Sequence, residues 1–144
     1  MTDTPSIGAV LEAFVNRVSH SRGRAMEFML SASITTAQAI LLHTVALTTQ
    51  CAPSDIATAM RLSPSSVSQM IERMAKQGLL ERVEAEDDRR RKVLAVTATG
   101  RQFLDELKAL RIQEYADGVA GLTPATRAQL EQALQAALKE LGPR

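Results

Sequence analysis

Hydroxyl, amide and cationic side chains lie along one face of a helix that the sequence predicts from Pro64 to about Gln77. They recur at helical spacing on the arc opposite an apolar stripe. Hydroxyls and amides can hydrogen-bond to base edges and phosphates, and cations can neutralise backbone charge, so this face suits a helix in a DNA major groove. An ordinary solvated helix face explains the same residues about equally well. The side chains are Ser65, Ser66, Ser68, Gln69, Arg73 and Lys76, with Ser63 at the helix start and Glu72 as the only acid.

A second group of cations forms a consecutive run of Arg89, Arg90, Arg91 and Lys92, which Glu84, Glu86, Asp87 and Asp88 precede. The segment is almost neutral in total but strongly polarised along the chain. We expect Asp88 to hold one neighbouring arginine in a fixed direction while another projects. An arginine on a projecting hairpin suits a narrow minor groove, where the negative potential is enhanced. A solvated charged turn is the alternative, and it is the commoner explanation of an isolated charge run.

Two short helices and a hairpin must position these side chains. Ser63 can accept the unpaired amide hydrogens of a helix start, and Pro64 lacks only an N–H that would go unused. Gly78 is placed to end that helix in the left-handed conformation. A preceding helix over 54–60 is separated from it by only three residues, which is the spacing of a helix-turn-helix. The inward stripe of the second helix comprises Val67, Met70, Ile71 and Met74.

A short strand is predicted over 79–83 and a β-branched run over 93–97, on either side of the charged segment, so the pair predicts a hairpin, or wing. The order of helix, serine-rich helix, Gly-Leu-Leu and charged hairpin resembles the winged helix-turn-helix of the MarR family of bacterial transcription regulators. The most specific part is the spacing of Asp88, Arg90, Thr97 and Gly100. The resemblance extends to residues 34–47 with their Thr-x-x-Gln start and to the flanking helices, so it covers essentially the whole chain.

The resemblance implies a mainly α-helical fold with a small β-hairpin wing, in a single domain over residues 1–144. Residues 34–97 would form the winged helix-turn-helix, and residues 6–33 and 98–142 the dimerisation helices. It implies a sequence-specific DNA-binding regulator, expected to be a repressor, whose affinity for double-stranded DNA changes when a small, often aromatic or acidic, effector binds. Arg90 would be the wing residue that reaches the minor groove. The run of three arginines leaves this assignment open by a residue or two.

The terminal helices carry more apolar surface than the winged module can cover. An amphipathic helix is expected from Ser6 towards Leu30, with a kink or break over 19–23, and another from Thr97 to 118 or at the latest Gly121. Residues 34–48 form a further helix, in which Ile40, Leu41, Val45 and Leu47 are expected to be buried. The last helix begins at Thr123-Pro124, ends at Gly142-Pro143 and carries Leu130, Leu134, Leu138 and Leu141.

We infer from this excess of apolar surface that the terminal helices pack against a second copy of the chain. Two-fold symmetry is the commonest closed arrangement, and it would present two recognition helices to major grooves about 34–36 Å apart on a pseudopalindromic operator. A compact monomer that folds its terminal helices back on itself is the alternative.

Four residues are candidates for an effector site. His20, Arg22 and Arg24 could receive an anionic group, although solvated cations at a helix end are the commoner case. His43 lies among apolar residues, where a histidine packed in a core or interface is more frequent than a ligand-binding one. Cys51 precedes the 54–60 helix; a redox sensor requires a lowered thiol pKa, and the local sequence supplies no cation to lower it.

Composition excludes several classes of protein. The chain of 144 residues has a net charge of +1, so it is no simple polycation, and its single cysteine excludes an intrachain disulfide or a multi-cysteine zinc site. No apolar run is long enough for a membrane span and the N-terminus lacks the basic start of a secretory signal, so a cytoplasmic protein is expected. With two distant histidines and no phosphate-binding glycine loop, we identify no catalytic residue, metal site or cofactor. The alternative functions are a helical protein-interaction module without DNA binding and a cysteine-based redox-sensing regulator.

Overall fold

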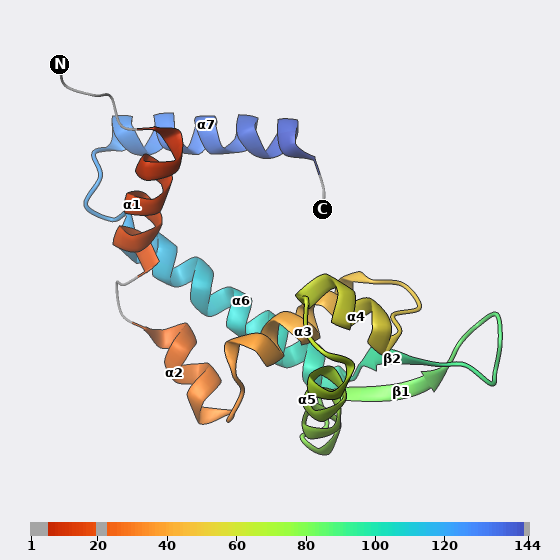
Figure 1. Ribbon diagram of the computed structural model, residues 1–144. Coiled ribbons are helices and arrows are strands. Elements are labelled where there is room, and N and C mark those ends of the chain that lie inside the picture. The colour runs from red at the N-terminus through yellow and green to blue at the C-terminus, as the bar shows by residue number, and fades with distance from the viewer. Residues whose placement is uncertain (1–5, 20–22, 143–144) are drawn as a thin grey trace. The chain divides into compact units, whose positions relative to one another are not determined.

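The computed structural model describes residues 6–19 and 23–142, and it is mainly helical with one antiparallel hairpin (Figure 1), as the sequence predicts. In chain order the helices and strands are α1 (Ile7–Ser19), α2 (Arg24–Ser31), α3 (Thr36–Leu47), α4 (Pro53–Met60), α5 (Pro64–Lys76), β1 (Leu80–Glu84), β2 (Lys92–Val96), α6 (Ala98–Gly118) and α7 (Pro124–Leu141). The first predicted helix is therefore two helices, because α1 ends at Ser19 and α2 begins at Arg24; most of the stretch predicted as a kink or break, residues 20–22, lies outside the described residues.

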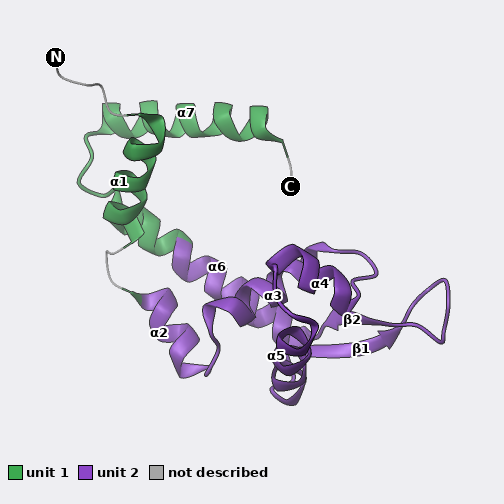
Figure 2. Cartoon of the chain, viewed as in Figure 1, with its two compact units in different colours: residues 1–23, 112–144 green, residues 24–111 purple. Residues whose placement is uncertain are grey.

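The chain divides into two compact units (Figure 2). Unit 1 comprises residues 1–23 and 112–144, and unit 2 comprises residues 24–111. Unit 2 is wider than the 34–97 segment proposed from the sequence, because it includes α2 and α6 as far as Arg111. The assignment of the whole chain to a single domain stays a prediction.

Unit 2 has an apolar core around α3, α4 and α5. Helix α3 begins in a capping box, in which Gln38 N donates to Thr35 Oγ1 at 3.2 Å and Thr35 N donates to Gln38 Oε1 at 2.8 Å. The second bond provides a donor for Gln38 Oε1 inside the core, where Gln38 is almost fully buried. The fully enclosed apolar side chains around it are those of Leu41, Leu42, Ile56, Val67, Ile71 and Met74.

Two of the four residues expected to be buried in α3 are exposed instead. Leu41 and Val45 are buried as predicted, but Ile40 is 50% exposed and Leu47 is 68% exposed. The prediction for these two was wrong because the buried face of α3 runs through Gln38, Leu41, Leu42 and Val45, at the spacing of one helical stripe. The apolar residues all around α3 concealed which face that was.

Unit 1 is built from α1, the end of α6 and α7, and little of it is buried. Among its described residues only Val18 and Glu114 are buried. Helix α7 begins as predicted, with Thr126 N donating to Thr123 Oγ1 at 3.2 Å and Pro124 in the first turn. A close backbone approach lies at Gly118, where a Cβ atom would stand 2.8 Å from Val18 Cα.

Across residues 6–19 and 23–142, no single helix has both the length and the apolarity to cross a membrane. Helices α2 and α3 pass that test only as a pair bent by 90°, and α3 contributes Ala39, Leu41, Leu42 and Val45 to the core of unit 2. Among the same residues no group of three or more histidine, cysteine, aspartate or glutamate side chains could hold a metal ion.

Candidate nucleic-acid interface

The predicted helix-turn-helix is α4, a short turn and α5. Helix α4 ends at Arg61, whose φ of 53° is left-handed, and Leu62 N donates to Ala57 O at 3.0 Å. The chain therefore reverses sharply within Arg61, Leu62 and Ser63, the three residues predicted as the turn. Helix α4 begins at Pro53, one residue earlier than expected, with Asp55 Oδ2 accepting the Ala52 N–H at 2.8 Å.

Helix α5 buries one face and exposes the other. Val67, Ile71 and Met74 are buried and Met70 is partly buried, so the predicted inward stripe is confirmed. All the side chains named from the sequence for DNA contact are exposed on this helix: Ser65, Ser66, Ser68, Gln69, Arg73 and Lys76. Because the buried stripe fixes the rotation of α5, these polar groups are held facing outward.

Three serine hydroxyls meet at the start of α5. Ser63 Oγ accepts the Ser66 N–H at 3.2 Å, and it lies 3.1 Å from Ser65 Oγ and 2.8 Å from Ser66 Oγ. The first of these bonds is the helix cap that the sequence predicts. The hydroxyls share one cluster at the exposed end of the helix, where phosphate oxygens are favourably bound.

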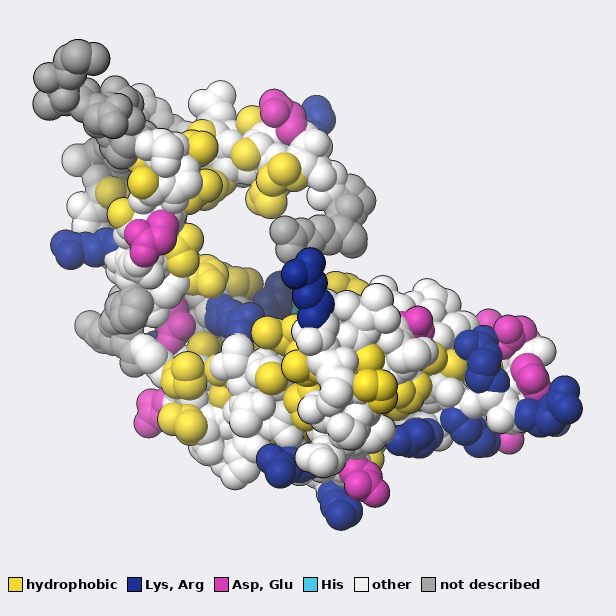
Figure 3. All heavy atoms as spheres, viewed as in Figure 1, with side chains coloured by type: hydrophobic (Ala, Val, Ile, Leu, Met, Phe, Trp, Pro, Cys, Tyr) yellow, Lys and Arg dark blue, Asp and Glu magenta, His cyan; other side chains and the backbone are white. Residues whose placement is uncertain are grey.

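The wing is a five-residue antiparallel pair in which Leu80 faces Val96 and Glu84 faces Lys92. Both strands lie within one residue of their predicted positions. The tip closes through Ala85 N, which donates to Arg91 O at 2.9 Å, and Arg91 N, which donates to Asp88 O at 2.9 Å. In Figure 3, Lys and Arg side chains gather below α5 and along the hairpin.

The cations of the wing tip differ in how they are held. Asp88 Oδ1 accepts the Arg90 backbone N–H at 2.9 Å and lies 3.4 Å from Arg90 Nε, so Asp88 does orient a neighbouring arginine. The Arg90 side chain remains 92% exposed. Lys92 Nζ lies 3.4 Å from Glu84 Oε1. Among the described residues, Arg89 is exposed and has no hydrogen bond or ion pair, so its guanidinium is free to meet a new partner.

Sequence reasoning missed the partner of Arg91. Its Nη2 donates to Asp87 Oδ1 at 2.7 Å, and this hydrogen bond is the main reason that the pKa of Asp87 is lowered and that of Arg91 is raised. Arg91 is therefore less available than Arg89 or Arg90 to a new anionic partner.

Thr97 and Gly100 join the wing to α5 and α6. Thr97 Oγ1 donates to Gly78 O and accepts the Gly100 N–H at 3.0 Å, so one hydroxyl links the end of α5 to the first turn of α6. A Cβ at position 100 would overlap Leu79 O and Val96 Cγ1. The Thr-x-x-Gly spacing thus has a structural reason: a capping hydroxyl and a glycine allow α6 to start against the backbone of Leu79.

A second contact that sequence reasoning missed links the α3–α4 loop to the wing. Glu86 N donates to Gln50 Oε1 at 3.1 Å, and Leu94 N donates to Cys51 O at 2.7 Å. The Gln50 contact spans 36 residues of chain, beyond any local pattern. These two bonds anchor the hairpin to the core of unit 2.

The structure brings no effector site together from the residues named for one. His20 and Arg22 lie outside the described residues, and Arg24 and His43 are exposed. His43 is therefore not a core histidine in this chain. Cys51 is fully buried, and its pKa is raised, first by burial and then by the Asp55 carboxylate. A buried thiol with a raised pKa is poorly suited to redox sensing.

The model of the MarR family matches residues 32–91. No curated protein matches the chain in sequence. Several solved structures share its fold. The S. aureus MepR–DNA complex has 20% sequence identity and a TM-score of 0.71, over 91% of this chain and 99% of that chain. YusO from Bacillus subtilis has 26% identity and a TM-score of 0.69, over 94% of each chain, and a mutant MarR from E. coli has 18% identity and a TM-score of 0.70, over 94% of this chain and 98% of that chain. MepR has also been solved bound to ethidium bromide, with 18% sequence identity and a TM-score of 0.67, over 96% of this chain and 98% of that chain.

Proposed function

We propose that the chain is a member of the MarR family, whose model matches residues 32–91, and that it is a sequence-specific regulator of transcription rather than an enzyme. It binds double-stranded DNA as a homodimer, with α5 in the major groove and the wing in the adjacent minor groove. A small-molecule effector changes its affinity for the operator, and the resulting regulation is repression.

The outward face of α5 carries this proposal. A helix whose opposite face is fully enclosed presents three serines, a glutamine and two cations to solvent, and only one acid. Ser, Gln and Arg are the residue types that hydrogen-bond to phosphates and to base edges in the major groove. The wing adds Arg89 and Arg90 at a projecting tip of the same compact unit. The likeness to MepR, which has been solved on DNA, supports the proposal.

Unit 1 supports the homodimer. Helix α7 has no buried residue, and Leu134, Leu138 and Leu141 are 44%, 68% and 81% exposed. Ile7, Val10, Leu11 and Val15 of α1 are exposed as well. Two helices with this much uncovered apolar surface favour packing against the same surface of a second copy.

The effector response follows from population shift. A ligand can change the affinity for DNA only by binding more tightly to one arrangement of the two α5 helices of the dimer than to another. MepR, a structural relative, has been solved with ethidium, which supports a small-molecule response in this chain.

Selection from a randomised duplex library with the full chain tests DNA binding. We expect enrichment of a pseudopalindrome, and affinity that falls with salt by a log–log slope of about 0.9 for each phosphate contact. Arg73→Ala and Arg90→Ala should each weaken binding by about 5- to 150-fold, the range of one good arginine contact. Lys108→Ala, on the exposed face of α6, is the control and should bind as the wild type. A chain that enriches no sequence is a protein-interaction module instead.

Sedimentation tests the homodimer with a matched pair of substitutions. Leu138→Lys should convert dimers to monomers, whereas Leu47→Lys should not, although both leucines are 68% exposed in the single chain. Equal effects of the two changes, or a monomeric wild type, would contradict the assignment of unit 1 as the interface.

A further inference from the structure

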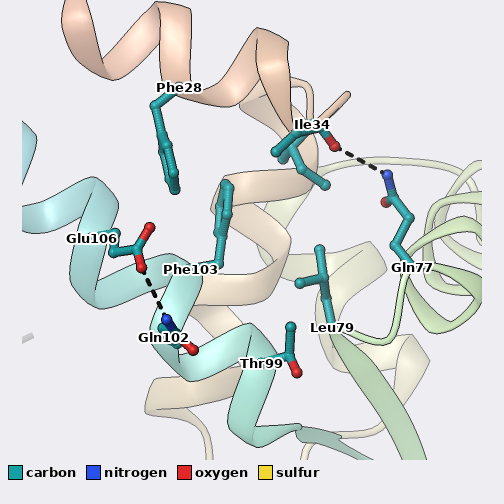
Figure 4. Close-up of a pocket in the computed structure, with 9 residues that line it drawn as sticks. Phe28, Ile34, Gln77, Leu79, Thr99, Gln102, Phe103 and Glu106 are labelled. Atoms are coloured by element: carbon teal, nitrogen blue, oxygen red, sulfur yellow. Dashed lines mark hydrogen bonds between the residues drawn. The ribbon is translucent and has the colours of Figure 1, made fainter.

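A pocket of about 460 Å³ lies within unit 2, between α2, the turn that follows it, the end of α5 and the first turns of α6 (Figure 4). Phe28, Ile34, Leu79 and Phe103 form apolar walls, and Gln77 and Glu106 are polar groups on opposite sides in that view. Mostly apolar walls with a few polar groups are typical of small-molecule sites of this size. Neither Arg24 nor His43, the two described residues considered for an effector, lines this pocket.

The two phenylalanines provide a flat aromatic surface. The rings of Phe28 and Phe103 are stacked, with centroids 5.1 Å apart and planes 20° apart. Phe103 is anchored in the core at 7% exposure, while Phe28 is partly exposed. A flat aromatic ligand can extend this stack, and a cation can lie against a ring face.

Gln77 offers an unused hydrogen-bond acceptor. Its Nε2 donates to Ala32 O at 3.4 Å and to Ser33 O at 3.5 Å. Because only the amide nitrogen can donate to these carbonyls, the orientation of the amide is fixed and Oε1 is the free atom. Gln77 Oε1 is buried and has no hydrogen-bond partner within the part of the chain that the structure describes. An unpaired buried acceptor is unfavourable, so a donor from a bound molecule would stabilise it.

Glu106 gives the pocket a negative charge. Its Oε1 accepts a hydrogen bond from Gln102 Nε2 at 3.1 Å, and this neutral partner leaves the charge uncompensated. Among the described residues, no lysine, arginine or histidine lines the pocket. A carboxylate on a bound molecule would therefore meet a like charge, whereas a protonated amine would meet an opposite one.

We propose that the pocket between Gln77 and Glu106 binds a flat aromatic molecule that carries a protonated amine and a ring N–H. The amine lies at the Glu106 carboxylate, the ring packs against Phe103, and the N–H donates to Gln77 Oε1. The chemistry of the pocket thus disfavours the acidic ligands that the family resemblance suggests.

Binding there also regulates DNA affinity, and this part rests on the proposed function. Gln77 is the residue that ends α5, and its amide already bonds to the turn after α2. Leu79, which lies between α5 and β1, and Thr99, in the first turn of α6, line the same pocket. A molecule seated between these segments favours one placement of the end of α5 over others.

Three indoles that differ mainly in charge test the ligand class on the full chain by titration calorimetry without DNA. Tryptamine should bind more tightly than neutral tryptophol, and indole-3-acetate should bind least. Replacing the ring N–H, in 3-(2-aminoethyl)benzothiophene, should weaken binding. An anion that binds as well as tryptamine would overturn the ligand class, and absence of tryptamine binding would overturn the site.

Two variants locate the binding. Glu106→Gln should weaken tryptamine by about two- to fivefold, as expected for a solvent-exposed charge pair, and should leave tryptophol unchanged. Asp105→Asn, the neighbouring exposed residue that does not line the pocket, is the control and should change neither. Gln77→Met should remove the advantage of tryptamine over its benzothiophene analogue. Unchanged binding in both pocket variants would overturn the assignment.

The regulatory part is measured separately, as the affinity for the selected duplex with and without saturating tryptamine. A change in affinity that Glu106→Gln reduces supports it, and an unchanged affinity overturns it while the pocket assignment stands on calorimetry. Failure of the chain to bind any duplex would refute the proposed function and leave the calorimetric result untouched.

Discussion

Units 1 and 2 each contain a helix with a regular apolar stripe, but the stripe is buried in unit 2 and exposed in unit 1. The stripe of α5 is enclosed, with Ile71 at 1% exposure and Met74 at 0%, while the equally regular leucine stripe of α7 leaves Leu138 at 68%. Both helices begin with a hydroxyl cap followed by proline. Local sequence therefore determines a helix and its apolar face, but the residues that cover that face come from elsewhere.

The hairpin tip shows the same contrast inside unit 2. Ala85 is buried at its base, whereas residues 86–92 are all exposed. The tip is held by backbone bonds and by surface ion pairs rather than by a core. Unit 2 thus combines an enclosed base with an exposed tip, whereas unit 1 leaves most of its described residues exposed.

The largest expected difference between the units is in how much the replacement of a leucine by alanine lowers the free energy of unfolding. Leu42→Ala should lower the free energy of unfolding by about 2–5 kcal/mol, because Leu42 is fully buried and a cavity would remain. Leu138→Ala should change it by less than about 0.5 kcal/mol at protein concentrations where the chain is monomeric. Urea unfolding at several protein concentrations measures both.

The concentration series also provides the control for this pair. If α7 forms the dimer interface, the effect of Leu138→Ala should grow with protein concentration while that of Leu42→Ala stays constant. A large effect of Leu138→Ala at every concentration would show that α7 packs within its own chain, and the contrast between the units would fail.

A smaller effect is expected from adding a methyl group at two helical glycines. Gly100→Ala should destabilise the chain by about 1–3 kcal/mol, because its Cβ would overlap the Leu79 carbonyl against which α6 starts. Gly8→Ala in α1 should instead stabilise it by about 0.4–1 kcal/mol, since the nearest atom would be Ser6 Oγ at 3.9 Å. Chemical denaturation of the two variants measures these opposite signs. Two changes of the same sign would contradict the packing at one of the sites.

The helix caps should give equal effects in the two units. Ser63→Ala and Thr123→Ala each remove one cap bond of 3.2 Å and should each destabilise by about 1 kcal/mol. Thermal unfolding followed by circular dichroism compares them. Equality would place the difference between the units in tertiary packing, whereas a much larger effect in unit 2 would show that the cap depends on the core.

What the sequence predicted correctly is mostly local. The α4–α5 turn, the caps at Ser63 and Thr123 and both strands could be placed because each depends on neighbouring residues. The outward polar face of α5 followed from its inward stripe. Whether those polar side chains contact DNA stays a prediction.

What the sequence did not show depends on residues distant in the chain. Ile40 and Leu47 were placed in the core because α3 is apolar on all sides, so periodicity could not choose its buried face. The bond from Gln50 to the wing spans 36 residues and has no local signature. The pocket beside Gln77 likewise combines residues from α2 and the turn after it, from the segment between α5 and β1, and from α6.

The smallest expected effect concerns the ion pair at the wing tip. The hydrogen bond from Arg91 lowers the pKa of Asp87, so the folded chain holds this proton less tightly than the unfolded chain does. Its contribution to stability is therefore complete above the ordinary pKa of an aspartate and is lost as the pH falls through the lowered value. Because both side chains are exposed, this contribution is small and screened by salt.

Titration of the Asp87 carboxyl by carbon-detected NMR measures this directly. Arg91→Ala should return the pKa of Asp87 to its ordinary range, whereas Arg89→Ala should leave it lowered, because the Arg89 guanidinium has no partner among the described residues. The same result from both variants would mean that the tip cations exchange partners. In that case the tip lacks fixed side-chain positions, and the distinction between an exposed Arg89 and a held Arg91 would be lost.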